Sequence, residues 1–93
     1  MKEDRYVLIT GGAKRIGRSI ALALARSGSN VAIHYNQSQK DSESIGEEIK
    51  ALGKKVLLLQ ADLSNSEEVT GIIPRILEHG SLVALINNAS IFE

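Results

Sequence analysis

The chain has 93 residues, 43% hydrophobic and 24% charged, and its 11 Lys and Arg residues balance 11 Asp and Glu residues. This balance argues against nucleic acid as a partner, and the absence of cysteine excludes disulfides and thiolate metal sites. No apolar run reaches membrane-spanning length, the first five residues lack the apolar stretch of a signal peptide, and the two histidines have no metal-ligand spacing. We therefore expect a cytoplasmic protein with neither a membrane segment nor a metal.

Short apolar runs alternate with longer amphipathic segments, which predicts parallel βαβ units. The expected strands cover residues 6–10, 30–35, 55–60 and 82–86. Apolar residues at helical spacing predict helices over residues 16–24, 45–52 and 69–77, and Gly28 and Gly53 are placed to end the first two. The spacing of Ser64 and Glu67 predicts a capping box for the third helix, which Pro74 should kink or shorten.

Right-handed crossovers place these strands in the order 3-2-1-4, which is the first half of a doubly wound parallel α/β sheet of the Rossmann type. Sheets of this kind bind ligands at the carboxyl ends of their strands. The unusual polar residues of this chain cluster at those ends: residues 10–17 after the first strand, 34–38 after the second, 62–63 after the third and 87–92 after the fourth.

The glycine-rich turn after the first strand predicts a phosphate-binding loop, because it leaves backbone N–H groups free at the start of a helix. Two alternatives remain open. The segment from Gly12 to Ser19 is one residue from a P-loop, although Arg18 replaces the lysine that such NTPases use. The turn could also be a glycine turn that binds no ligand.

The loop from Thr10 to Gly17 reads Thr-Gly-Gly-Ala-Lys-Arg-Ile-Gly and resembles the Thr-Gly-x-x-x-Gly-x-Gly turn of the short-chain dehydrogenase/reductase family. Arg15 replaces the middle glycine. The Asp-Leu pair at 62–63 and the Asn-Asn-Ala segment at 87–89 support the resemblance, which covers essentially the whole chain. Arg15, the His-Tyr-Asn segment at 34–36 and residues 90–92 resemble the pteridine reductase branch of the family.

The cofactor expected is NADPH or NADP. An NAD-selective site usually has an acidic residue at the end of the second strand, but none occurs between Gly17 and Lys40, whereas Lys14 and Arg15 suit a 2′-phosphate. Gln37 departs from the arginine usual in the pteridine reductase branch, and the nearby polar residues could also be solvated loop residues. The cofactor-binding residues that the resemblance implies are Thr10, Gly11, Lys14, Arg15, Ile16, Gly17, His34, Tyr35, Asn36, Gln37, Ser38, Asp62, Leu63, Asn88, Ala89 and Ser90.

Within this set, Asp62 matches the family residue that pairs with the adenine amino group, or it bonds locally to backbone N–H groups. Asn88 is expected to brace the central strands. The resemblance also implies a substrate site made by Arg15, Ser90 and Phe92, with the phenylalanine stacked on a pterin-like ring, although a lone aromatic is more often core filling.

The catalytic tyrosine of this family, its lysine four residues later and its serine lie beyond the fourth strand, so no catalytic residue is expected in this chain. Tyr6 and Tyr35 have no lysine four residues on. We interpret residues 1–93 as the N-terminal part of a single NAD(P)-binding domain, truncated before the catalytic segment. The complete enzyme, commonly a tetramer in this family, would transfer hydride from NADPH to a pterin-like or other carbonyl or imine small molecule. The alternative is a truncated nucleotide-binding or interaction module without catalytic activity.

Overall fold

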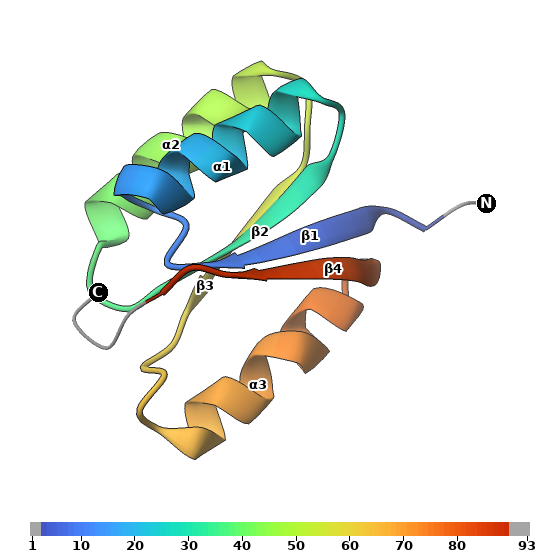
Figure 1. Cartoon of the computed structure of the whole chain (residues 1–93). Coiled ribbons are helices and arrows are strands. Elements are labelled where there is room, and N and C mark those ends of the chain that lie inside the picture. The colour runs from blue at the N-terminus through green and yellow to red at the C-terminus, as the bar shows by residue number, and fades with distance from the viewer. Residues whose placement is uncertain (1–2, 90–93) are drawn as a thin grey trace.

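A computed structural model describes residues 3–89 and shows strands and helices in strict alternation (Figure 1). The strands are β1 (Arg5–Thr10), β2 (Asn30–Tyr35), β3 (Val56–Gln60) and β4 (Ser81–Asn87), and the helices are α1 (Arg15–Arg26), α2 (Gln39–Ala51) and α3 (Ser66–Leu77). The strands form one parallel sheet in the order β3-β2-β1-β4. The predicted fold class and strand order are confirmed.

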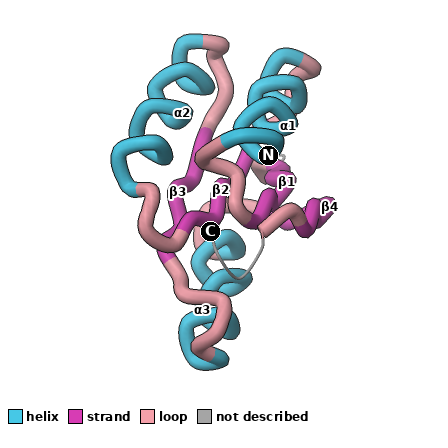
Figure 2. Tube along the Cα trace, turned by 60° about the vertical axis from the view of Figure 1, so that its left-hand side comes forward, coloured by secondary structure: helices cyan, strands magenta, loops and turns pink. Residues whose placement is uncertain are grey.

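The sheet lies between two helical layers, with α1 and α2 on one face and α3 on the other (Figures 1 and 2). Successive side chains of a strand point to opposite faces, so Ile9 of β1 packs beneath α1 and α2 whereas Leu8 packs against α3. The strands β1 and β2 are covered on both faces, and this explains their almost continuous apolar sequences.

The start of α3 differs from the predicted capping box by one residue. Asn65 is the N-cap, and its Oδ1 accepts hydrogen bonds from the backbone N–H groups of Glu67 at 3.0 Å and Glu68 at 3.4 Å. Ser64 is not the cap, and its hydroxyl and its N–H both donate to Asp62 instead. Pro74 does not end the helix, which continues to Leu77.

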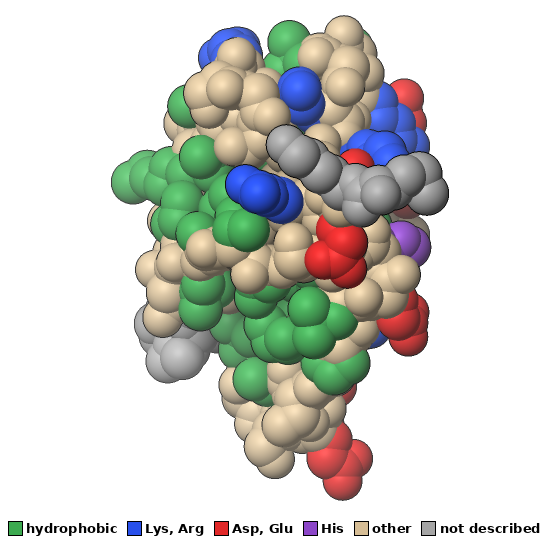
Figure 3. Space-filling model, turned by 90° about the vertical axis from the view of Figure 1, so that its right-hand side faces the viewer, with side chains coloured by type: hydrophobic (Ala, Val, Ile, Leu, Met, Phe, Trp, Pro, Cys, Tyr) green, Lys and Arg blue, Asp and Glu red, His purple; other side chains and the backbone are tan. Residues whose placement is uncertain are grey.

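The outer strand β4 exposes apolar side chains. Val83 and Leu85 are each 56% exposed, and no strand pairs with the outer edge of β4 in the part of the chain that the structure describes. Val83 is an extra residue in the ladder, since Tyr6 pairs with Leu82 and Val7 pairs with Ala84. Hydrophobic side chains are also visible across the middle of the face shown in Figure 3. Within residues 3–89, the outer edge of β4 is therefore both unpaired and apolar.

Candidate functional site

The glycine loop between β1 and α1 is packed so tightly that a side chain cannot be added at Gly17. A Cβ atom there would lie 2.1 Å from the carbonyl oxygen of Gly11 and 2.7 Å from Nδ2 of Asn88. That same Nδ2 donates a hydrogen bond to the Gly11 oxygen at 3.2 Å. The first turn of α1 is thus held directly against the loop and against the segment that follows β4, as predicted for the bracing role of Asn88.

Arg15 is the only non-glycine residue among the described residues with a positive φ, at 56°. This left-handed conformation favours glycine because a Cβ atom crowds the backbone there. It gives a physical reason why the family motif has glycine at this position. The Arg15 side chain is exposed, as is that of Ile16, which is 70% exposed.

The N-terminus of α1 is open, in contrast to that of α3. No side chain caps the first turn of α1 within residues 3–89, and that turn contains no acidic residue. The first turn of α3 has both the Asn65 cap and two glutamates. A helix N-terminus with free N–H groups and no acidic side chain suits an anionic group such as a phosphate.

Thr10 joins the ends of β1 and β4 through a hydroxyl whose hydrogen-bonding capacity is fully used. Its Oγ1 donates to Oδ1 of Asn87 at 2.9 Å and accepts from the backbone N–H groups of Asn88 at 2.9 Å and Ala89 at 3.1 Å. With one donor and two acceptor positions used, the hydroxyl has no further capacity for a ligand. The Thr10 hydroxyl therefore holds the segment after β4 in place and is not available to bind a ligand.

His34 lies behind the loop as well. Its ring is buried, Nδ1 accepts from the N–H of Gly11 at 3.0 Å, and Nε2 lies 2.8 Å from the carbonyl oxygen of Ala61. The N–H of Gly12 donates to the backbone oxygen of His34 at 3.1 Å. Two N–H groups of the glycine loop are thus occupied, whereas the first turn of α1 has no capping side chain and its N–H groups suit a phosphate.

The residues after β2 meet the loop in a small pocket, as predicted from the parallel topology. Its lining consists of Gly11, Ala13, His34, Tyr35, Asn36 and Ser38. Gln37 is exposed and lines a neighbouring hollow with the start of α2. Asn36 is oriented by Gln60, whose amide donates to both the backbone and the side-chain oxygen of Asn36.

Asp62 follows β3 at the same edge of the sheet and makes the local contacts that were one of its two expected roles. Its Oδ1 accepts from the Ser64 hydroxyl at 2.7 Å and from the Ser64 N–H at 2.9 Å, and these bonds lower the pKa of Asp62 below the usual aspartate value. The N–H of Asp62 donates to Glu68. Leu63 beside it is 38% exposed.

Ser64→Ala is expected to raise the pKa of Asp62 toward its ordinary value, because the hydroxyl bond is the largest cause of the shift. A lowered pKa in the folded state stabilises the fold above the unfolded-state pKa, and this stabilisation disappears as the pH falls through the folded value. In the variant, the carboxyl resonance should titrate at a higher pH in an NMR titration. An unchanged midpoint contradicts the assignment of Ser64 as the cause.

Other parts of the structure limit what the site can do. Burial, followed by the charge of Asp4, raises the pKa of Tyr6, whereas a tyrosine that donates a proton at neutral pH needs a lower value. Arg18, the residue at the P-loop lysine position, forms an ion pair with Glu48 of α2.

Over residues 3–89 there is no metal-binding group of His, Cys, Asp and Glu, and no helix is both long and apolar enough to span a bilayer. Ser90 and Phe92, the predicted substrate residues, lie outside the described residues.

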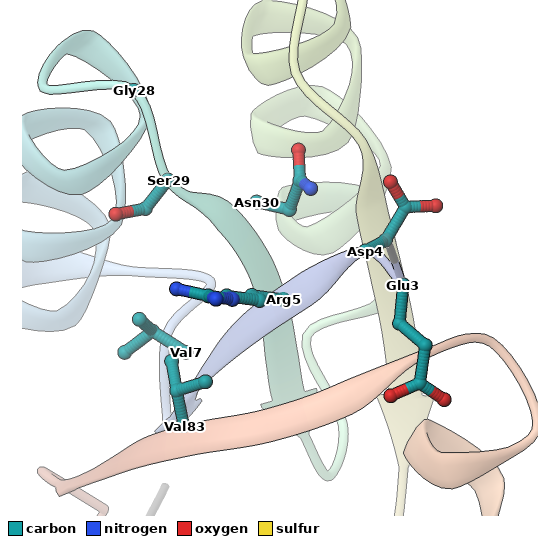
Figure 4. Close-up of a pocket in the computed structure, with 8 residues that line it drawn as sticks. All are labelled: Glu3, Asp4, Arg5, Val7, Gly28, Ser29, Asn30 and Val83. Carbon is teal, nitrogen blue, oxygen red and sulfur yellow. The ribbon is translucent and has the colours of Figure 1, made fainter. Parts of the chain in front are cut away.

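A second hollow lies at the opposite, amino-terminal end of the sheet (Figure 4). It is lined in part by Glu3, Asp4 and Arg5 and by the turn between α1 and β2. Asp4 is paired with Lys55 at 2.6 Å and raises the pKa of that lysine. The hollow has no residue of the glycine loop and none that follows the carboxyl end of a strand, so we place the candidate site at the other end.

Two features of the site were not predicted: the inward position of His34 and the roles of Asn65 and Glu68 after β3. A histidine within an otherwise apolar strand is a signal for the first, because a buried imidazole needs hydrogen-bond partners. For the second, the sequence has two suitable capping residues in succession, and contacts with Asp62 decide between them.

The strand order and the glycine loop define a Rossmann-type α/β domain. The short chain dehydrogenase family matches residues 5–93, and the chain belongs to this family. It is 44% identical over 92 residues to the 3-oxoacyl-[acyl-carrier-protein] reductase FabG of Staphylococcus aureus, covering 98% of this chain and 37% of that protein. It is 37% identical over 89 residues to the short-chain dehydrogenase/reductase homolog YusS of Bacillus subtilis, covering 95% of this chain and 82% of YusS.

Among solved structures, the chain is similar to FolM alternative dihydrofolate reductase 1 from Brucella canis, complexed with NADP. The TM-score is 0.85 at 39% sequence identity, and the match covers 95% of this chain and 36% of that one. The chain therefore spans little more than a third of the length of these two reductases.

Proposed function

We propose that this chain binds NADPH as the N-terminal, cofactor-binding part of a single short-chain reductase domain. The observation that carries the proposal is the open N-terminus of α1, which lies at the carboxyl edge of the sheet behind the tightly packed loop from Gly11 to Gly17. The FolM structures similar to this chain are complexes with NADP, which supports this cofactor.

The charge of the site favours NADPH over NADH. The pocket that joins the glycine loop to the exit of β2 has no carboxylate in its lining, so no acidic side chain there repels a 2′-phosphate. Lys14 and Arg15 are close in sequence to this pocket and supply positive charge. Gln37 is the one residue that weakens this argument, since it is neutral and lies away from the pocket.

In this proposal, the phosphates bind to the first turn of α1, the adenosine binds between the exits of β2 and β3, and the nicotinamide lies toward the exit of β4. Ile16 is an exposed apolar side chain at the helix N-terminus, and the cofactor would cover it. Asp62 and Leu63 would contact the adenine. His34 and Thr10 would act through the loop, because their polar side-chain atoms are already bonded within the protein.

Arg15 provides the sharpest test. Because its φ is 56°, Arg15→Gly is expected to stabilise the fold by about 1 kcal/mol, measured by urea unfolding. If the guanidinium binds the cofactor phosphates, the same substitution weakens NADPH binding about tenfold. A gain of stability together with a loss of affinity distinguishes a binding residue from one that only shapes the turn.

The binding experiment is a titration of the wild-type chain with NADPH and, separately, with NADH, followed by nucleotide fluorescence. NADPH is expected to bind at least about tenfold more tightly, the value of one charge-assisted contact to the 2′-phosphate. Equal affinity refutes the 2′-phosphate assignment. No binding of either nucleotide refutes the proposed function.

For the complete enzyme, we propose hydride transfer from NADPH to a carbonyl or imine compound with a pterin-like ring. Support comes from Arg15 in place of the motif glycine and from the similarity to an alternative dihydrofolate reductase. The similarity to 3-oxoacyl-[acyl-carrier-protein] reductases favours a 3-oxoacyl substrate as the second candidate. Assays of the complete enzyme with a dihydropterin and with a 3-oxoacyl thioester would distinguish the two.

A further inference from the structure

We propose that His34 is a positioning residue that fixes the glycine loop for the nucleotide, and that it does so as a neutral imidazole protonated on Nε2. The inference rests on the proposed NADPH binding, since the loop that it positions is the proposed phosphate site. His34 was expected to contact the cofactor directly, but its ring is turned into the protein and only 2% of the residue is exposed.

The hydrogen bonds determine the tautomer. The backbone N–H of Gly11 is a donor, so Nδ1 must be the unprotonated acceptor in the 3.0 Å contact. The backbone oxygen of Ala61 is an acceptor, so Nε2 must carry the proton in the 2.8 Å contact. A proton on Nδ1 would place two donors against each other across the Gly11 contact.

The same residue connects three strand exits. The His34 ring bonds to Gly11 after β1 and to Ala61 after β3, and its own backbone oxygen accepts from Gly12. Gly11 in turn contacts the segment after β4 and the start of α1, because its carbonyl oxygen accepts from Asn88 and lies nearest to the position that a Cβ atom would take at Gly17. Through these contacts, His34 fixes the position of the glycine loop relative to the first turn of α1.

Two substitutions separate the two ring contacts. His34→Asn keeps an oxygen at the position of Nδ1 and so retains the acceptor for Gly11, but it cannot reach Ala61. His34→Gln keeps an amide nitrogen at the position of Nε2 and so retains the donor to Ala61, but it leaves the Gly11 N–H without its acceptor. Each variant loses one buried hydrogen bond, so both should lose similar stability.

The experiment measures NADPH affinity on the wild-type full chain and on both variants, and imidazole ¹⁵N NMR on the wild-type chain, which retains the His34 ring. We expect the Asn variant to bind NADPH within about threefold of wild type and the Gln variant to bind at least about tenfold more weakly. Equal losses of affinity in the two variants overturn the proposal, as does unchanged affinity in the Gln variant.

The NMR measurement does not depend on the nucleotide. The wild-type spectrum should show His34 with an unprotonated Nδ1 and a protonated Nε2, with the exposed His79 as an internal reference. The Gly11 amide should exchange with solvent at least about tenfold faster in the Gln variant than in the Asn variant. The opposite tautomer, or equal exchange, overturns the proposal. The NMR results can be as expected even if the wild-type chain binds no NADPH. In that case the hydrogen bond between Gly11 and His34 is supported, but the proposed function and the role of His34 in nucleotide positioning are both refuted.

Discussion

Gly17→Ala is expected to destabilise the fold by about 3 kcal/mol or more and to abolish NADPH binding, because the added methyl group has no room. It would lie 2.1 Å from the Gly11 carbonyl oxygen, a backbone atom that cannot rotate away, and 2.7 Å from Asn88 Nδ2. Relief requires α1 to move away from the loop, which breaks the Asn88 contact and displaces the first turn of the helix. Urea unfolding followed by circular dichroism measures the loss.

Gly71→Ala is the matched control for this prediction. Gly71 is also within a helix, but a Cβ atom at that position has no neighbour within 4 Å. There the higher helix propensity of alanine should stabilise the protein by about 0.5–1 kcal/mol. A similar change in stability for the two variants would show that Gly17 is not close-packed and would contradict the loop geometry.

Thr10→Val should cost about 2–4 kcal/mol, since it removes a hydroxyl that makes three hydrogen bonds while leaving the shape of the side chain unchanged. The N–H groups of Asn88 and Ala89 lose their acceptor, and Asn87 loses its donor. Because Thr10 is only 8% exposed, water cannot readily replace the hydroxyl. Thermal unfolding of the variant measures this loss.

Thr10→Ser retains the hydroxyl and loses only a methyl group, so it should cost about 1 kcal/mol. The comparison separates the hydrogen bonds from the packing of the methyl group. If the serine variant is as unstable as the valine variant, packing rather than the bonded hydroxyl holds β1 to β4 at this edge.

The fold could be predicted because its signals are local. β1 and β2 are buried on both faces, so they appear as continuous apolar runs, and the helices between them have an apolar stripe that faces the sheet. The order of the strands then followed from the handedness of the crossovers. The boundaries of α3 were less predictable, because Ser64 and Asn65 are both good capping residues and the contact between Ser64 and Asp62 decides which one is used.

The candidate site was predictable in position but not in orientation. Parallel topology brings the residues after each strand to one edge, and the pocket shared by Gly11, Tyr35 and Ser38 agrees with this. Whether a side chain at that edge faces the ligand or the protein depends on partners distant in sequence. His34 turns inward because Ala61 and Gly11 supply a matching acceptor and donor, and both of these partners lie outside residues 30–35.

The contacts at the carboxyl edge also bear on how the chain folds. Thr10 bonds to Asn87 across 77 residues, and Asn88 bonds to Gly11 across the same separation. Such contacts close nearly the whole chain into a loop, an entropic barrier that makes them slow to form. The nucleotide loop should therefore be completed late in folding, when β4 joins β1. A ligand that binds only the completed loop would retard unfolding of the entire chain, so the rate of unfolding in the presence of nucleotide reports on the assembly of all four strands.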